Sequence, residues 1–319
     1  MSYRGGEILI QLFQNLEVEY IFCSPGTEWT ALWEGLSERY GRGENSIKYI
    51  NCRHEMLAVS AAIGYSKATG KVAAVLLHAN LGPLNGAMAI RAAQWAQAPI
   101  IICSAYTTGY DEDKGRLTTE SHWLSRLSDI GGPSNLVKPY VKWSNSVTSK
   151  ETMVDSIVRG CQIAQALPQG PVFIAIPREL LVGTVEDLSI PTSYAVPSPP
   201  GPQLDSIAEA AKLLVDAERP IIITEYAGEN PKIVDKMTKL AEMLSIPVYE
   251  YTSPMYANFP KSHPLHQGYD ASGALNEADI ILSIGAVTPW YPPSLFPQGS
   301  TRVIAIDADP LNPRLPYHN

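Results

Sequence analysis

Glu55 is the first residue whose type and position could carry chemistry. It follows Arg53 and His54 at the start of a predicted helix, and small residues come after it at positions 58, 61, 62 and 64. A carboxylate at a helix start also has a simpler explanation, because its charge suits the amino-terminal end of the helix dipole. A face of alanine and glycine, however, fills a core poorly and permits another group to approach closely. We therefore treat Glu55 as a candidate site residue.

His78 is the second candidate. It ends the apolar run Val75-Leu76-Leu77, at the position where a parallel strand brings side chains to the ligand-binding edge of its sheet. An imidazole there could transfer protons near neutral pH. A histidine that ends a strand and bonds only to the backbone is the alternative, and the residues alone leave both interpretations open.

The elements that must position these two residues alternate between strand and helix. Apolar runs predict strands at residues 20–23, 48–51, 72–77, 99–104 and 171–176. Apolar spacing predicts helices at 6–15, from about 28, at 54–68, 85–97 and 148–167, with Ser24 or Thr27 capping the second and Gly70 ending the third. Aliphatic strands separated by helices indicate a parallel sheet covered on both faces.

The same alternation resumes after a proline-rich stretch. Residues 188–204 contain five prolines, which cannot lie inside a helix or a central strand. Beyond them we predict helices at 206–217 and 231–244, and strands at 220–224, 247–249, 280–284 and 303–306. The predicted fold class is α/β with two doubly wound parallel-sheet domains, at residues 1–185 and 205–319, joined by a linker at 186–204.

Composition excludes several classes of protein. The 319 residues are 45% hydrophobic and 18% charged, unlike a disordered chain, and 24 basic against 32 acidic residues give a net charge of −8. Scattered lysines and arginines argue against a nucleic-acid partner, and no apolar stretch is long enough to span a membrane. Four widely spaced cysteines indicate reduced thiols, and the amino terminus lacks a secretory signal, so we expect a cytoplasmic protein.

Motifs along the whole chain resemble those of thiamine diphosphate enzymes of the acetolactate synthase and benzoylformate decarboxylase type. In the first half they are Ser24-Pro25-Gly26, Arg53-His54-Glu55, Gly64 to Lys71, Ala98-Pro99-Ile100, Gly170-Pro171-Val172 and Ile176-Pro177. In the second half they are Pro264 to Gly268, Glu277-Ala278-Asp279, Ile284-Gly285-Ala286 and Ile306 to Pro310. Each motif is weak alone, and their order and spacing make the resemblance specific.

This resemblance implies a role for each candidate. The glutamate that activates the cofactor falls at Glu55, where a carboxyl group bonded to the aminopyrimidine of thiamine diphosphate promotes removal of the C2 proton. The loop that begins at His78 is similar to that of benzoylformate decarboxylase, which implies that His78 is catalytic. The family's cofactor-binding positions fall at Pro25, Gly26, Gly82 and Asn85, in addition to Glu55.

Two weaker substrate candidates come from the same resemblance. Thr27 falls where related decarboxylases carry a serine near the substrate carboxylate, although helix capping explains it as well. His122 falls near a family segment that lines the cofactor pocket, but the phenylalanine and glutamine of that segment are absent, so a surface histidine is the better interpretation. The loop 224–228 lacks a clear Gly-x-Gly turn, so FAD, which some relatives bind in this domain, is not favoured.

The chain lacks the motifs that bind the diphosphate in this family. No Gly-Asp-Gly and no paired asparagine occurs, so the family's oxygen ligands for Mg²⁺ and diphosphate are absent. We therefore expect a second subunit that carries the diphosphate-binding domain, rather than a fragment, and an assembly with two copies of each subunit. The helix segment 58–65 is expected to lie in that contact or in a self-association interface.

The leading hypothesis is a subunit of a heteromeric thiamine diphosphate enzyme. It would make or break a carbon–carbon bond beside a carbonyl, by decarboxylating a 2-oxo acid or by carboligation with an aldehyde or ketone, as acetolactate synthase-like enzymes do. The alternative is a non-catalytic binding or regulatory subunit that retains the fold, against which Glu55 argues. A nucleotide-binding oxidoreductase is disfavoured, because no Gly-x-Gly-x-x-Gly follows a strand.

Overall fold

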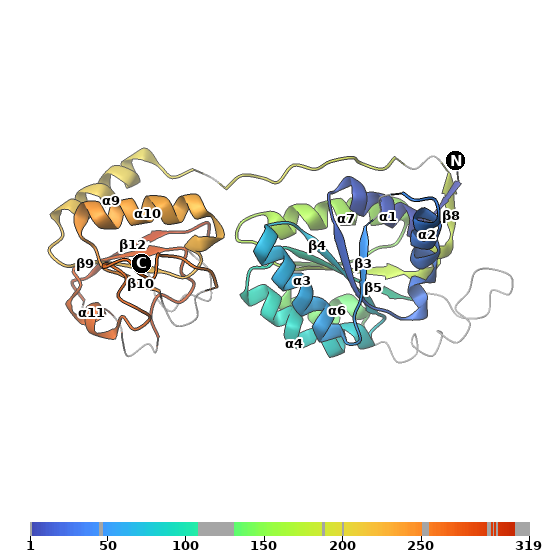
Figure 1. Cartoon of the computed structure of the whole chain (residues 1–319), viewed down its shortest axis with the longest axis horizontal. Helices are drawn as coiled ribbons and strands as arrows, with labels where there is room; N and C mark the ends of the chain where they lie inside the picture. Colours follow the sequence, from blue (N-terminus) through green and yellow to red (C-terminus); the bar gives the residue numbers. More distant parts are fainter. Residues whose placement is uncertain are drawn as a thin grey trace. The chain divides into compact units, whose positions relative to one another are not determined.

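The chain divides into two compact units, residues 1–198 and 199–319, and the division falls inside the proline-rich stretch. The computed structural model describes residues 2–44, 47–107, 131–186, 189–199, 201–250, 255–291, 295, 297 and 299–309. Each unit is built around its own parallel sheet with helices on both faces, which confirms the predicted α/β class (Figure 1). None of the described helices is long and apolar enough to cross a membrane.

The first unit contains a six-stranded parallel sheet in the order β3-β2-β4-β5-β7-β6. Its strands are β2 (Tyr20–Ser24), β3 (Lys48–Asn51), β4 (Ala73–His78), β5 (Ile100–Tyr106), β6 (Trp143–Ser146) and β7 (Val172–Pro177). Strand β7 is buried throughout, and β4 and β5 are buried up to their last residues, as expected of strands covered on both faces. A short antiparallel pair, β1 (Ser2–Arg4) with β8 (Thr184–Glu186), forms a separate sheet.

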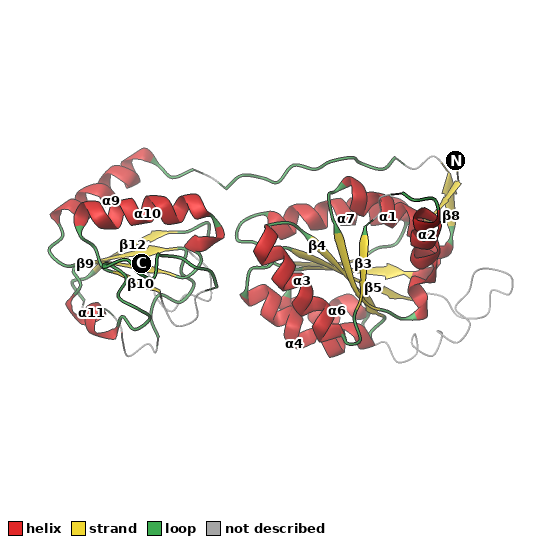
Figure 2. Ribbon diagram, viewed as in Figure 1, coloured by secondary structure: helices red, strands yellow, loops and turns green. Residues whose placement is uncertain are grey.

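The helices of the first unit form two layers on the six-stranded sheet. They are α1 (Gly5–Asn15), α2 (Thr30–Gly41), α3 (Glu55–Thr69), α4 (Leu81–Trp95), α6 (Pro133–Val137), α7 (Lys150–Gln165) and α8 (Arg178–Val182), with the 3-10 turns η1 (Thr27–Trp29) and η3 (Lys138–Tyr140). Helices α1, α2 and α7 bury Phe13, Leu32 and Ile157 in one core against the strands. Helices α3, α4 and α6 cover the opposite face (Figure 2).

Most predicted helices and strands of this unit are confirmed, and the starts of two helices differ. Gly70 ends α3 in the left-handed conformation, with φ of 71°. Neither Ser24 nor Thr27 caps a helix, because η1 follows Gly26 without a side-chain cap and α2 follows Trp29. Helix α4 begins at Leu81 rather than at the predicted residue 85. Strand β6 and helix α6 were not predicted, since their short, polar sequences carry no apolar periodicity.

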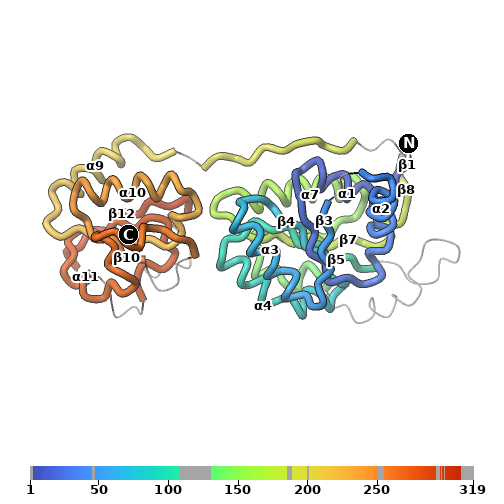
Figure 3. Tube along the Cα trace, viewed as in Figure 1, coloured from blue at the N-terminus to red at the C-terminus, as the bar shows by residue number. Residues whose placement is uncertain are grey.

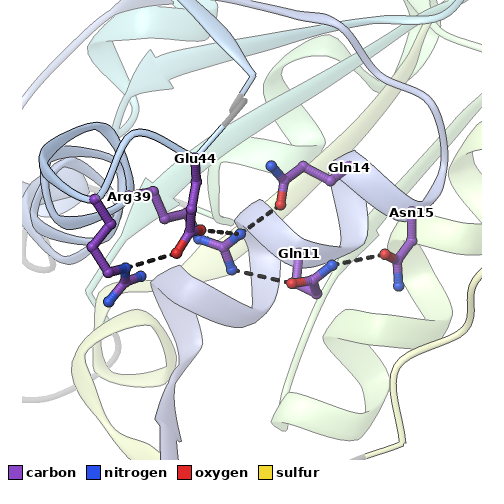
Figure 4. A network of polar contacts seen from close by, with 6 residues as sticks. Gln11, Gln14, Asn15, Arg39 and Glu44 are labelled. Atoms are coloured by element: carbon purple, nitrogen blue, oxygen red, sulfur yellow. Dashed lines mark hydrogen bonds and ion pairs between the residues drawn. The ribbon is translucent and has the colours of Figure 1, made fainter.

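A polar network joins α1 to α2 (Figure 4), and a further bond extends it to the segment that follows β8. Arg39 donates from Nη1 to Gln14 Oε1 at 2.7 Å and from Nη2 to Gln11 Oε1 at 3.1 Å. Gln11 donates to Asn15 Oδ1 at 2.8 Å, and Asn15 donates to the carbonyl oxygen of Pro191 at 2.9 Å. These bonds hold the start of the proline-rich stretch against the first unit.

The second unit contains a four-stranded parallel sheet in the order β10-β9-β11-β12. Its elements are α9 (Leu204–Asp216), β9 (Pro220–Thr224), η4 (Ala227–Glu229), α10 (Pro231–Leu244), β10 (Val248–Glu250), α11 (Ser272–Glu277), β11 (Ile280–Ile284) and β12 (Arg302–Ile306), and the trace can be followed in Figure 3. Alternate residues of one strand enter different cores: Ile222 packs with α9 and α10, and Ile223 packs with α11. This alternation is why both faces of each strand are apolar.

Candidate functional site

The candidate site lies where the order of strands in the first sheet reverses. The chain passes from β2 to β3 on one side of β2, whereas β4 and β5 lie on its other side. The turns at the carboxyl ends of β2 and β4 therefore diverge, and such a switch point is the usual ligand crevice of an open parallel sheet. The turn after β2 contains Pro25 and Gly26, and β4 ends at His78. Gly26, one of the predicted positions, is thus brought beside the candidate histidine.

Glu28, in turn η1, is the residue that links these two strand ends. Its carboxylate is 2% exposed, and Oε1 lies 2.7 Å from His78 Nδ1 and accepts a hydrogen bond from the backbone N–H of Ala79 at 2.9 Å. Sequence reasoning treated Glu28 only as the start of a helix. The sequence does show that Glu28 follows the strand β2 and that His78 ends the strand β4. That β2 and β4 are neighbours in the sheet, however, could be known only from the order of the strands.

Gly26 makes the contact between Glu28 and His78 sterically possible. A Cβ atom at position 26 would lie 1.9 Å from His78 Nδ1 and 2.3 Å from Glu28 Oε2, far inside van der Waals contact. Any side chain at this position would therefore separate the imidazole from the carboxylate. Gly26 was predicted from the family resemblance, and the structure gives it a local steric reason.

Two further hydrogen bonds hold the turn after β4. Trp29, which is fully buried, donates from Nε1 to the carbonyl oxygen of Leu77 at 2.9 Å, and Ser104 on β5 donates to the carbonyl oxygen of Ala79. Together with the Glu28 bond to its amide, they fix Ala79 at φ of 29°, a conformation that residues other than glycine rarely adopt. Strained backbone of this kind tends to occur at functional sites, where the surrounding structure compensates for it.

The protonation of His78 depends on this environment. The hydrogen bond with Glu28 raises the pKa of the imidazole above its ordinary value, and partial burial of the ring opposes that effect. The charges of Glu28 and Glu55 add to the increase. The His78 side chain remains 32% exposed, so the ring can exchange protons with solvent or with a bound molecule.

Glu55 is the first residue of α3, and only 9% of it is exposed. Asn85, inside α4, donates from Nδ2 to Glu55 Oε2 at 3.3 Å. Gly86 lies beside the same side chain, since a Cβ atom there would be 3.6 Å from Glu55 Cβ. His54 acts as a helix cap, because its Nδ1 accepts the backbone N–H of Met56 at 3.1 Å. The structure thus brings the predicted Glu55 and Asn85 together.

Gly82 sets the approach of α4 to the sheet. A Cβ atom at this position would lie 2.7 Å from Leu77 Cβ and 3.1 Å from its carbonyl carbon, so only glycine permits the observed packing. Because α4 begins at Leu81, Asn85 lies in its second turn and not at the helix start.

The remaining candidates are less well connected to this site. Thr27 is exposed at the start of η1, and Pro25 is half-buried in the turn before it. His122 lies outside the described residues. Of the small residues of α3, Ala58 and Ala62 are fully buried within the chain itself. Among the described residues, no group of three or more His, Cys, Asp or Glu side chains could hold a metal ion.

The second sheet has a corresponding switch point between β9 and β11, and a carboxylate is bound there. Glu225, 2% exposed, follows β9, and its Oε2 accepts backbone N–H groups of Val287 at 2.9 Å and Thr288 at 3.3 Å. These amides follow β11, at the edge where nucleotide phosphates bind in related folds. In this chain both amides already donate to the carboxylate of Glu225.

Family comparisons cover both units. Residues 3–126 match the family described as "Thiamine pyrophosphate enzyme, N-terminal TPP binding domain", and residues 207–314 match "Thiamine pyrophosphate enzyme, central domain". The acetolactate synthase large subunit of Haemophilus influenzae is 25% identical over 292 residues, which cover 88% of this chain and 48% of that protein. The sulfoacetaldehyde acetyltransferase of Roseovarius nubinhibens is 25% identical over 284 residues, with 84% and 44% covered. The chain spans about half the length of the curated relatives it matches.

Solved structures show the same fold. A thiamine diphosphate-dependent 4-hydroxybenzoylformate decarboxylase of Rhodococcus jostii RHA1 superposes with a TM-score of 0.81 at 24% identity, covering 97% of this chain and 57% of that one. A benzoylformate decarboxylase from Polynucleobacter necessarius gives a TM-score of 0.79 at 23% identity, covering 96% and 56%.

Proposed function

Since this chain belongs to the thiamine pyrophosphate enzyme family and carries its N-terminal and central domains, we propose that it is one subunit of a heteromeric enzyme acting on carbon–carbon bonds. The bond made or broken lies next to a carbonyl, in decarboxylation of a 2-oxo acid, in carboligation with an aldehyde or ketone, or in both. The similarity to acetolactate synthases and benzoylformate decarboxylases supports this range of reactions. The observation that carries the proposal is the buried Glu55 carboxylate with Asn85 beside it.

The residues around Glu55 fit the pyrimidine half of thiamine diphosphate. Glu55 is buried, its Oε2 accepts a hydrogen bond from the Asn85 amide, and Gly86 lies in ordinary contact distance of Glu55 Cβ without adding a side chain there. In this proposal Glu55 and Asn85 hold the ring, while Pro25, Gly26 and Gly82 shape the surrounding backbone. When bound, the cofactor supplies the carbon nucleophile and electron sink for the reaction. Glu55 Oε1, which accepts no hydrogen bond from the described residues, would exchange a proton with a ring nitrogen.

His78 is the second catalytic residue in this proposal. It ends β4 at the switch point, and its imidazole would give a proton to, or take one from, the reacting carbonyl compound. Thr27 and His122 remain weaker candidates for contact with the substrate. The described residues offer no ligand cluster for Mg²⁺, and no step is assigned to a metal within this chain.

A second subunit, carrying the diphosphate-binding domain, completes the site in this proposal. The helices that carry Glu55 and Asn85 also carry exposed apolar side chains, which we call the α3/α4 apolar patch: Met56, Leu57, Leu81, Leu84 and Met88, each between 42% and 64% exposed. The last three recur at the i, i+3, i+7 spacing of one face of α4. Exposed apolar side chains gathered on neighbouring helices support a protein–protein contact at this face.

The simplest assembly contains two copies of each subunit, so that self-association and the contact with the second subunit both occur. We place this complex in the cytoplasm, because all four cysteines are unpaired and buried, as is usual in a reducing compartment. The central domain is proposed to act without FAD, since the amides of Val287 and Thr288 are bound by Glu225.

The decisive experiment replaces Glu55 by glutamine in the assembled complex. Glu55→Gln keeps the size of the side chain and its contact with Asn85 but cannot exchange a proton, so turnover should fall by about 10² to 10⁴ while assembly is retained. Product formation from a panel of 2-oxo acids, aldehydes and diketones, with thiamine diphosphate and Mg²⁺ present, measures the effect.

A matched control is Glu34→Gln, which removes an exposed carboxylate of α2 that pairs with Arg4 and should leave turnover unchanged. Full activity in the assembled Glu55→Gln complex would contradict the proposal. It would instead favour the alternative, a non-catalytic binding or regulatory subunit that retains the fold.

A further inference from the structure

The carboxylate of Glu28 is hydrogen-bonded through one oxygen only. Oε1 meets both the Ala79 amide and His78 Nδ1, whereas Oε2 is buried and has no hydrogen-bond partner within the described part of the chain. Buried polar atoms without a partner are rare in folded proteins, because nothing compensates the loss of their hydration. His78 and the backbone amide of Ala79 are therefore the groups that the Glu28 carboxylate contacts within the described part of the chain, and of these two only His78 can change its charge.

This contact determines which nitrogen of His78 carries hydrogen. A carboxylate has no hydrogen to donate, so the 2.7 Å contact requires Nδ1 of the imidazole to be the donor. The other nitrogen, Nε2, is then the atom that gains or loses a proton when the ring changes charge. The fixed turn after β4, with Ala79 bonded to the same Glu28 oxygen, restrains the direction in which the ring points.

The charged groups that face His78 from the described elements are both acidic. Glu28 contributes from η1 and Glu55 from the start of α3, and both favour the cationic form of the imidazole. Glu28 has the larger effect because it is hydrogen-bonded to the ring. Gly26 allows this arrangement, since any side chain there would occupy the position of the contact.

We propose that Glu28 is a positioning residue that orients His78 and holds a hydrogen on Nδ1, so that Nε2 presents the exchangeable proton to the substrate. The inference rests on the proposed function, because it takes that substrate to be the carbonyl compound of a thiamine diphosphate enzyme. The carboxylate acts as in the Asp–His pair of serine proteases: it fixes the orientation of the imidazole and stabilises its cation.

The test compares Glu28→Gln with Glu28→Asp and with Glu38→Gln, an exposed position on α2. Glutamine keeps an oxygen for the Ala79 amide but removes the charge, whereas aspartate keeps the charge. The titration of His78 is followed by NMR of the full chain with labelled histidine, and its signal is identified by its loss in His78→Asn. Glu28→Gln should lower the pKa of His78 by about one to three pH units. Glu28→Asp should lower it less, and Glu38→Gln should not change it.

The second measurement is the pH dependence of kcat/KM for the assembled enzyme. The part of the pH profile that reflects ionisation of His78 is called here the His78 limb. In Glu28→Gln its apparent pKa should change by the same amount as the pKa measured by NMR, a change that a purely structural role of Glu28 would not produce. An unchanged His78 titration in folded Glu28→Gln would overturn the inference, as would a displaced titration with an unchanged limb. If Glu28→Gln does not fold, the same comparison is made with Glu28→Asp.

The NMR measurement needs neither substrate nor partner. A complex that is inactive on every carbonyl compound would count against the proposed function, and the His78 titration would still decide whether Glu28 controls the imidazole.

Discussion

At the scale of single residues, the site depends on the lack of a side chain at Gly26. Gly26 is compatible with the site because the space that a Cβ atom would fill holds His78 Nδ1 and Glu28 Oε2. Both are ends of side chains, which can rotate away, so a methyl group at position 26 should break the Glu28–His78 contact without preventing folding.

Gly26→Ala should therefore change how the stability of the chain depends on pH. The pKa of His78 is raised in the folded protein, so its pair with Glu28 stabilises the fold fully below the unfolded value of about 6.5. That contribution is lost as the pH rises through the folded pKa. The difference in free energy of unfolding between wild type and Gly26→Ala should be largest below about pH 6 and shrink above neutrality, as measured by urea unfolding at a series of pH values.

The control for this prediction is Gly41→Ala, since a Cβ atom there would meet nothing within 4 Å. A pH-independent difference between Gly26→Ala and wild type would show that His78 titrates alike in both proteins.

At the scale of elements, the position of α4 decides whether Asn85 reaches Glu55. Helix α4 approaches the end of β4 closely at Gly82, whose Cβ would meet the side chain and the main chain of Leu77. Main-chain atoms of a central strand cannot move without disturbing the sheet. By contrast, Gly64 in α3 faces open space, since a Cβ atom there would meet nothing within 4 Å.

Two glycine-to-alanine substitutions should consequently have opposite effects on stability. Gly82→Ala should lower the free energy of unfolding by about 1–3 kcal/mol, because overpacking forces α4 away from β4. Gly64→Ala should raise it by about 0.5–1 kcal/mol, because alanine favours an exposed helix interior. Urea unfolding of the full chain at one pH measures both. Equal effects of the two substitutions would contradict the role given to Gly82.

At the scale of the whole molecule, the chain presents the α3/α4 apolar patch and matches about half of the length of its curated relatives. In the proposed function, thiamine diphosphate is held jointly by this chain and by the second subunit. The purified chain should show no tight, Mg²⁺-dependent binding of thiamine diphosphate by calorimetry. Tight binding to the chain alone would contradict the shared site.

Assembly should depend on the patch. Leu84→Asp places a charge in the middle of the α4 face, so it should abolish the complex with the second subunit, as measured by analytical ultracentrifugation. The matched control is Leu204→Asp, because Leu204 on α9 is 82% exposed and lies outside the patch. Unimpaired assembly of Leu84→Asp would place the contact elsewhere on the chain.

Local patterns in the sequence were sufficient for most of the fold. The strand that ends at His78 and the stop of α3 at Gly70 were predicted correctly, because apolar runs and a left-handed glycine are properties of neighbouring residues. The assignment to the thiamine diphosphate enzymes was also correct, since its motifs depend on order along the chain. The starts of α2 and α4 were not predicted correctly; Trp29 and Gly82, which lie at these starts, make tertiary contacts with Leu77 that no local pattern shows.

The pairing of the site residues was decided only by the tertiary structure. Glu28 lies 50 positions from His78, and Asn85 lies 30 positions from Glu55, so no local pattern relates them. The sheet order β3-β2-β4 brings their loops to one edge, and the space above Gly26 admits the imidazole and the carboxylate together. Sequence alone could identify the candidate glutamate and histidine. Which groups touch them follows from packing between segments that are distant along the chain, and for His78 this packing raises the pKa of the imidazole.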